Sequence, residues 1–142
     1  MPGDGLPSLV LDASVAAKLG FEEDDSSLAR DWRKRVGMMA PDFLVIEIAS
    51  VAAKRVRRGL STDDEAGRAM RDVGELVDRL VPSAPLVPRV FELARDHGIS
   101  VYDGLYLALA EKSGALVLTA DAKLVQRACA AGLEHLVRPL AD

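Results

Sequence analysis

The chain has 142 residues, 49% apolar and 28% charged, a balance typical of one globular domain and unlike that of a disordered chain. Its net charge of −4 argues against a protein that simply coats nucleic acid. The single cysteine, Cys129, excludes an internal disulfide and fits a reducing compartment. Because the start carries no basic leader and no apolar run approaches the roughly 18 residues needed to cross a bilayer, we expect a cytoplasmic protein with no membrane association.

Strand and helix patterns alternate along the chain. Asp42 is expected to cap a long helix that ends at Gly59, and Ser100 begins a helix with the form of a capping box. The expected elements, in chain order, are a strand at 8–12, helices at 14–20 and 26–36, a strand at 38–40, helices at 42–58 and 62–78, a strand at 79–81, helices at 88–97 and 100–113, a strand at 115–119, a helix at 122–131 and a last strand near 135–138.

This alternation predicts an α/β fold in three layers, α/β/α, with a central parallel sheet of four to five short strands. The near-continuous apolar runs at 8–11 and 115–118 indicate central strands, buried on both faces. We find no repeat or linker, so residues 1–142 are expected to form a single domain.

Four acidic residues lie where a globular chain rarely places them. Asp12 and Asp121 each close an apolar strand, Glu47 interrupts an apolar helix, and Asp103 opens another apolar stretch. A carboxylate in such surroundings is costly unless a positive group meets it.

Each acid also has a structural interpretation. Asp12, Asp103 and Asp121 stand at helix starts, where capping alone would explain any one of them. Glu47 has no possible partner one helical turn away, and we expect it to be buried in an apolar helix. It then needs either a distant arginine or a metal or substrate site.

Topology brings the four acids together. In a parallel sheet, residues that follow strands and residues that begin the returning helices meet at the carboxyl edge. Three or four carboxylates without cysteine or histidine partners suit Mg²⁺ or Mn²⁺, which support phosphodiester hydrolysis. Zinc does not fit, because Cys129, His97 and His135 lack ligand spacing.

Two hydroxyl residues stand close to these acids in the chain. Ser14 and Thr119 lie two residues from Asp12 and Asp121, so their hydroxyls could hydrogen-bond a ligating carboxylate. Ser14 could equally cap its own helix, and Thr119 could be an ordinary β-branched strand residue.

Positive charge is concentrated in one part of the chain. Eight of the 18 lysines and arginines lie between residues 30 and 58. If the two helices that carry them lie side by side, they could form a patch that grips phosphates; otherwise they are solvated helix faces. The candidate RNA-binding residues are Arg33, Lys34, Lys54, Arg55 and Arg58.

Several segments together resemble the PIN-domain family, especially the VapC-like toxins of toxin–antitoxin pairs. The segments are Val10–Val15, Ala40–Val51 with the basic run that follows it to Gly59, Ser100–Ala110 and Leu116–Asp121, in the order and spacing of the family. The resemblance implies a Rossmann-like sheet and a catalytic quartet, Asp12, Glu47, Asp103 and Asp121, that binds Mg²⁺ or Mn²⁺.

The same resemblance assigns further properties. Ser14 matches the small hydroxyl residue beside the site, and Thr119 a position before the last acid. The resemblance also implies an endoribonuclease that acts on tRNA, rRNA or mRNA. It implies a homodimer, and a small cognate antitoxin whose tail fills the active-site groove. Gly104 departs from the pattern, since alanine is frequent there, and is expected to loosen its helix start.

Two other classes of protein share part of this sequence pattern. A receiver or haloacid-dehalogenase-like phosphotransfer domain also places carboxylates and Mg²⁺ at a sheet edge, but this chain has Ala13 and Ser14 where those families need further acids. A non-catalytic binding module, whose acids receive a basic tail, is the second alternative.

Overall fold

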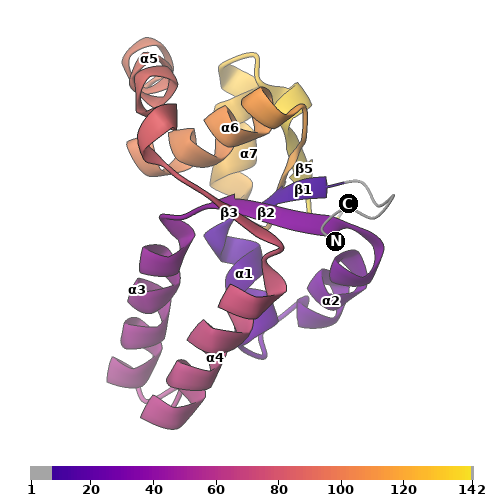
Figure 1. The fold of residues 1–142 in the computed structure, drawn as a ribbon, viewed down its shortest axis with the longest axis vertical. Coiled ribbons are helices and arrows are strands. Elements are labelled where there is room, and N and C mark those ends of the chain that lie inside the picture. The colour runs from indigo at the N-terminus through magenta and orange to yellow at the C-terminus, as the bar shows by residue number, and fades with distance from the viewer. Residues whose placement is uncertain (1–7, 142) are drawn as a thin grey trace.

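The computed structural model describes residues 8–141, whose strands form one wholly parallel sheet (Figure 1). The strands are β1 (Ser8–Leu11), β2 (Gly37–Pro41), β3 (Arg79–Val81), β4 (Val117–Thr119) and β5 (Val137–Pro139). Their order across the sheet is β3-β2-β1-β4-β5. The predicted parallel sheet of four to five short strands is therefore confirmed.

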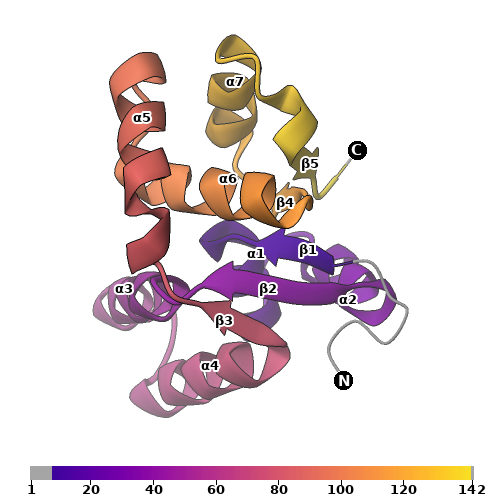
Figure 2. The same ribbon diagram turned by 45° about the horizontal axis from the view of Figure 1, so that its top comes forward.

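Helices cover both faces of this sheet. They are α1 (Ala13–Gly20), α2 (Ser26–Arg35), α3 (Leu44–Arg57), α4 (Asp63–Leu76), α5 (Val87–His97), α6 (Val101–Ser113) and α7 (Ala122–Ala130), with short 3₁₀ turns at Ala84–Leu86 and Glu134–Leu136. Figures 1 and 2 show α1 to α4 on one face and α5 to α7 on the other, which confirms the three layers. None of the helices within residues 8–141 is long and apolar enough to span a membrane.

The direction in which the chain adds strands to the sheet reverses between β1 and β4. It first builds β1, β2 and β3 outward on one side, then returns to add β4 and β5 on the other. Leu11 is in register with Leu118, so Asp12 and Thr119 come next to each other at the carboxyl ends of these strands. Such a switch point is where open parallel sheets bind ligands. The prediction that β1 and β4 are interior strands is confirmed.

The start of α3 differs from the prediction. The helix begins at Leu44 and has no side-chain cap, so the expected role of Asp42 as its N-cap is wrong. Instead, the backbone N–H and the hydroxyl of Ser83 donate to Asp42 Oδ1, at 3.1 and 2.6 Å. The side chain is satisfied by a distant turn after β3, which a local capping pattern cannot reveal.

The expected burial of Glu47 was also wrong. Helix α3 buries only a stripe that includes Leu44 and Ile48, while Val45 and Ile46 are 54% and 60% exposed. Glu47 itself is half-buried. The apolar composition of this helix therefore reflects a partly exposed apolar face rather than a helix enclosed on all sides.

Gly104 has a packing role that the family comparison did not suggest. A Cβ added to Gly104 would lie 3.1 Å from Cγ1 of Val90 on α5. The residue is buried in α6, and α5 packs closely against it. Gly104 therefore permits a close approach between α5 and α6, whatever its effect on the start of the helix.

Candidate active site

Asp12 lies at the centre of the switch point and is only 5% exposed. It caps α1 by accepting the backbone N–H of Val15 at 3.1 Å, and the hydroxyl of Ser14 donates to it at 2.6 Å. Burial raises the pKa of Asp12 to about 6, partly offset by hydrogen bonds from Ser14 and Thr119. The capping role and the site role thus coexist in one carboxylate.

Ser14 and Thr119 connect the two sides of the switch point. Ser14 Oγ accepts the backbone N–H of Ala120 at 2.9 Å and lies 3.4 Å from Thr119 Oγ1. The Thr119 hydroxyl accepts the backbone N–H of Asp121 at 3.0 Å. These hydroxyls hold the loop after β4 against the end of β1.

Asp121 caps the last long helix. Its carboxylate accepts the backbone N–H of Lys123 at 2.9 Å, and its side chain remains partly exposed at the sheet edge. A capping carboxylate uses one oxygen, so the other remains available to a cation.

The carboxylate of Glu47 accepts a hydrogen bond from a tyrosine, not from the distant arginine that was one of the alternatives. The hydroxyl of Tyr106, which is 3% exposed, donates to Glu47 Oε1 at 2.5 Å. Burial raises the pKa of Glu47, the Tyr106 hydrogen bond opposes that shift, and the negative charge of Asp103 adds to it. Burial and the nearby carboxylate of Glu47 together hold the pKa of Tyr106 well above its ordinary value.

Asp103 is met by an arginine from the following helix. Arg127 Nη1 lies 3.4 Å from Asp103 Oδ2. Burial and the charge of Asp121 raise the pKa of Asp103, while Arg127 lowers it. Sequence reasoning had not selected Tyr106 or Arg127. The only available signal was that Tyr106 follows Asp103 by three residues, on the same helix face.

Electrostatic interactions connect all four acids. The charge of Asp121 acts on both Asp12 and Asp103, and that of Asp103 acts on Glu47. Each of the four acids therefore lies near at least one other.

The four acids do not form a closed ligand cage. Within residues 8–141, no three acidic, cysteine or histidine side chains are grouped tightly enough to hold a metal ion. Two of the acids are engaged by Tyr106 and Arg127, and like charges keep carboxylates apart. The donor set is nevertheless all oxygen, which fits a hard divalent cation.

A shallow groove of about 460 Å³ extends from Glu47 along α3. Lys54 lies on the same side of the helix, two turns after Glu47, and lines the groove together with Ser50 and Tyr102. The ring of Tyr102 stacks on Phe43 with 5.3 Å between ring centroids. A cation and an exposed aromatic ring thus lie beside the acidic edge.

The candidate RNA-binding residues are not brought together in one patch. Helix α2 packs on α1, whereas α3 packs on α1 and α4, and Figure 1 shows α2 on the far side of α1 and α4 from α3. Arg33 pairs with Asp78 at 3.6 Å and Arg55 pairs with Glu23 at 3.2 Å. The residues left exposed are Lys34, Lys54 and Arg58.

A parallel sheet with helices on both faces and acidic side chains at the carboxyl ends of its central strands defines a class of α/β domain that binds ligands at this edge. Residues 9–129 match the PIN domain, and the chain belongs to that family. The resemblance drawn from the sequence is thereby confirmed.

Named relatives show which members of the PIN-domain family this chain is similar to. Ribonuclease VapC3 of Pyrobaculum aerophilum is 38% identical over 122 residues, which cover 84% of this chain and 93% of the relative. Ribonuclease VapC12 of Mycobacterium tuberculosis is 32% identical over 119 residues, 83% of this chain and 90% of the relative. The structure of VapBC-1 from nontypeable Haemophilus influenzae has the same fold, with a TM-score of 0.66 at 16% identity over 95% of this chain and 99% of that one.

Proposed function

We propose that this protein is a metal-dependent endoribonuclease and the toxin of a toxin–antitoxin pair. The observation that carries the proposal is the match of residues 9–129 to the PIN domain, and it is supported by four carboxylates, Asp12, Glu47, Asp103 and Asp121, each of which lies near another. Relatives of nearly the same length are named ribonucleases, which supports RNA as the substrate.

The four carboxylates would hold Mg²⁺ or Mn²⁺. When bound, such an ion activates water and stabilises charge on the leaving oxygen of a phosphodiester. Burial is the main cause of the raised pKa values of Asp12, Glu47 and Asp103, and neighbouring carboxylates add to it; a bound divalent cation would offset this cost of holding the acids ionised.

Neighbouring side chains orient these acids. The Ser14 hydroxyl fixes one oxygen of Asp12, and the Tyr106 hydroxyl fixes one oxygen of Glu47. Because both donors are themselves held by the fold, the carboxylates keep their direction before any ligand arrives.

Two cations are placed to hold RNA phosphates. Arg127 lies against Asp103 with its side chain half exposed, and Lys54 lines the groove that leaves Glu47. Arg127 could contact a phosphate beside Asp103, and Lys54 could contact a phosphate in the groove beside Glu47. We assign both residues to substrate binding; Lys34 and Arg58 lie farther along the surface and are weaker candidates.

A small antitoxin and a homodimer are the proposed protein partners. Similarity to VapBC-1 over nearly the whole chain supports the first. For the second, Phe43, Val87, Phe91, Val101 and Tyr102 line an apolar hollow of about 390 Å³ on α5 and α6. Four of these side chains are about half exposed, and a contiguous apolar surface of this kind is typical of a contact between protein copies.

The test is cleavage of total RNA by purified protein freed of any bound partner, with Mg²⁺ or Mn²⁺, followed by mapping of the cut ends. Asp103→Asn should reduce cleavage by at least about 100-fold while leaving the melting temperature close to that of the parent. Asp72→Asn, which removes an exposed charge from α4, serves as the matched control and should cut normally. Unchanged cleavage by Asp103→Asn would show that the site is wrongly assigned.

A further inference from the structure

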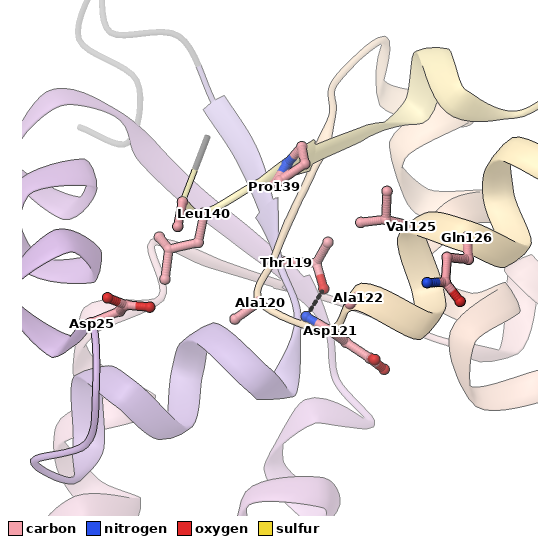
Figure 3. Close-up of a pocket in the computed structure, with 10 residues that line it drawn as sticks. Asp25, Thr119, Ala120, Asp121, Ala122, Val125, Gln126, Pro139 and Leu140 are labelled. Atoms are coloured by element: carbon pink, nitrogen blue, oxygen red, sulfur yellow. Dashed lines mark hydrogen bonds between the residues drawn. The ribbon is translucent and has the colours of Figure 1, made fainter.

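A pocket of about 330 Å³ opens next to Asp121, and none of its lining residues lines the Glu47 groove (Figure 3). It lies between the start of α7, the segment after β5 and the loop before α2. We call it the α7 pocket and define it by Asp25, Thr119, Asp121, Val125, Gln126 and Leu140. Asp121 belongs both to this pocket and to the acidic quartet, so a ligand in the pocket would touch the site.

The walls of the α7 pocket combine apolar side chains with four polar ones, Asp25, Thr119, Asp121 and Gln126. Val125, Pro139 and Leu140 supply the apolar part. Figure 3 shows Asp25 at one end of the labelled residues and Gln126 at the other. Such a mixture suits a planar ring that carries hydrogen-bonding groups at its edge.

The side chain of Asp25 is free to accept hydrogen bonds. It stands at the N-cap of α2 but makes no capping bond there, and within the described part of the chain no hydrogen bond or ion pair is assigned to its carboxylate. Its backbone is left-handed, with φ of 66°. This conformation is uncommon for residues other than glycine, although asparagine and aspartate adopt it more often than most.

Charge limits what can enter the pocket. Asp25 and Asp121 both present carboxylates, which repel phosphate and favour N–H donors. A nucleobase satisfies every condition, because it is planar, uncharged and edged with donors and acceptors.

We infer that the α7 pocket binds the base of a nucleotide next to the scissile phosphate and makes cleavage base-selective, an inference that rests on the proposed ribonuclease function. Asp25 would accept an amino N–H, and Gln126 would reach a second edge position. Cytosine, adenine and guanine carry such an amino group and uracil does not. The one edge donor of uracil, its N3–H, lies between two carbonyl oxygens that repel a carboxylate, so the pocket disfavours uracil.

The first arm of the test needs no catalysis. Free cytidine, adenosine, guanosine and uridine are titrated into the whole protein, and NMR shifts are followed at the amides of Val125, Gln126 and Leu140. Amino-bearing nucleosides should shift these signals at lower concentration than uridine. Gln126→Leu should weaken their binding by about tenfold, as expected for the loss of paired edge contacts.

Asp25→Asn tests the selectivity. Asparagine keeps the left-handed backbone and the shape but adds a donor, so it should bring uridine binding close to that of cytidine. Asp31→Asn removes the same charge from the same helix at an exposed position outside the pocket and should change nothing.

The second arm measures cleavage of RNA oligonucleotides randomised on both sides of the cut. The parent should discriminate against uracil at one flanking position by about tenfold, and Asp25→Asn should abolish that preference without abolishing cleavage. If both pocket variants bind nucleosides and choose bases as the parent does, the inference is overturned. If nucleosides occupy the pocket but no variant cuts RNA, the ribonuclease proposal fails while the base pocket stands.

Discussion

The carboxylate of Asp12 is buried at the end of β1 without a positive partner, although two donors hydrogen-bond to it. Its folded pKa is about 6, against an ordinary 3.8. A group whose pKa is raised by folding contributes stability that is fully present below its unfolded pKa and is lost as pH rises through the folded value. In the absence of metal, Asp12 should therefore destabilise the protein above about pH 6.

Asp12→Asn should consequently stabilise the metal-free protein at pH 8. The expected gain in unfolding free energy is roughly 2–3 kcal/mol, because each pKa unit corresponds to about 1.4 kcal/mol and asparagine still accepts the bonds from Ser14 and Val15. The gain should vanish near pH 4. Urea unfolding with EDTA at both pH values measures it, with Asp72→Asn as the control. A variant less stable than the parent at pH 8 would contradict the burial argument.

Arg127 should have opposite effects on metal and on RNA. It now competes for Asp103, so Arg127→Ala should tighten Mn²⁺ binding about two- to fivefold, in line with a partly exposed ion pair. The same change removes the proposed phosphate contact and should weaken binding of an RNA oligonucleotide. Calorimetry with Mn²⁺ and a separate RNA titration measure the two effects, with Arg68→Ala on α4 as the control. Weakening of both would instead indicate that Arg127 only supports the fold of the site.

At the scale of elements, most helices and strands were predictable because their signals are local. Gly59, Gly98 and Gly114 follow helices in the left-handed conformation that glycine permits, as the sequence pattern indicated. Thr62 and Glu65 form a reciprocal capping box at the start of α4. The prediction that Asp42 caps α3 is wrong because its carboxylate accepts hydrogen bonds from Ser83, some 40 residues later in the chain.

The contact between α5 and α6 gives a prediction at this scale. Gly104→Ala gains helix propensity, worth about 1 kcal/mol, but forces a methyl group against the buried, stiff side chain of Val90. We expect a net loss of about 1 kcal/mol, since overpacking a tight core usually costs more than propensity supplies. In a Val90→Ala background the same substitution should become stabilising. Denaturant unfolding of the four proteins in this double-mutant cycle measures the coupling, and additive effects would refute the contact.

At the scale of the whole molecule, sheet order decides which charged groups become neighbours. Because β1 and β4 are adjacent, Asp12 and Asp121 share an edge although more than 100 residues separate them. The two basic helices, close in sequence, are instead kept apart by α1 and α4. The condition for one positive patch, that these helices lie side by side, is therefore not met, and of the candidate RNA-binding residues only Lys54 lines the groove.

The apolar surface on α5 and α6 gives a prediction about assembly. Phe91 is 59% exposed there, with Arg95 above its ring at 5.4 Å. If two copies meet on this surface, Phe91→Glu should convert a dimer into a monomer without changing the fold, because it places a charge in an apolar contact. Light scattering after size exclusion, with circular dichroism as the fold check, measures the result. A dimer that survives the substitution places the contact elsewhere.

The chain pattern was sufficient for the alternation of elements, the parallel sheet and the position of Asp12 and Asp121 after adjacent strands, because periodicity, caps and the topology of parallel sheets depend on local residues and on general rules. Contacts across long sequence separations had to come from the fold: the Tyr106 hydroxyl on Glu47, the Arg127 guanidinium on Asp103, the pairing of Asp42 with Ser83 and the walls of the α7 pocket. Each depends on how helices pack against one another, and helix packing is set by the summed fit of many side chains rather than by any segment alone.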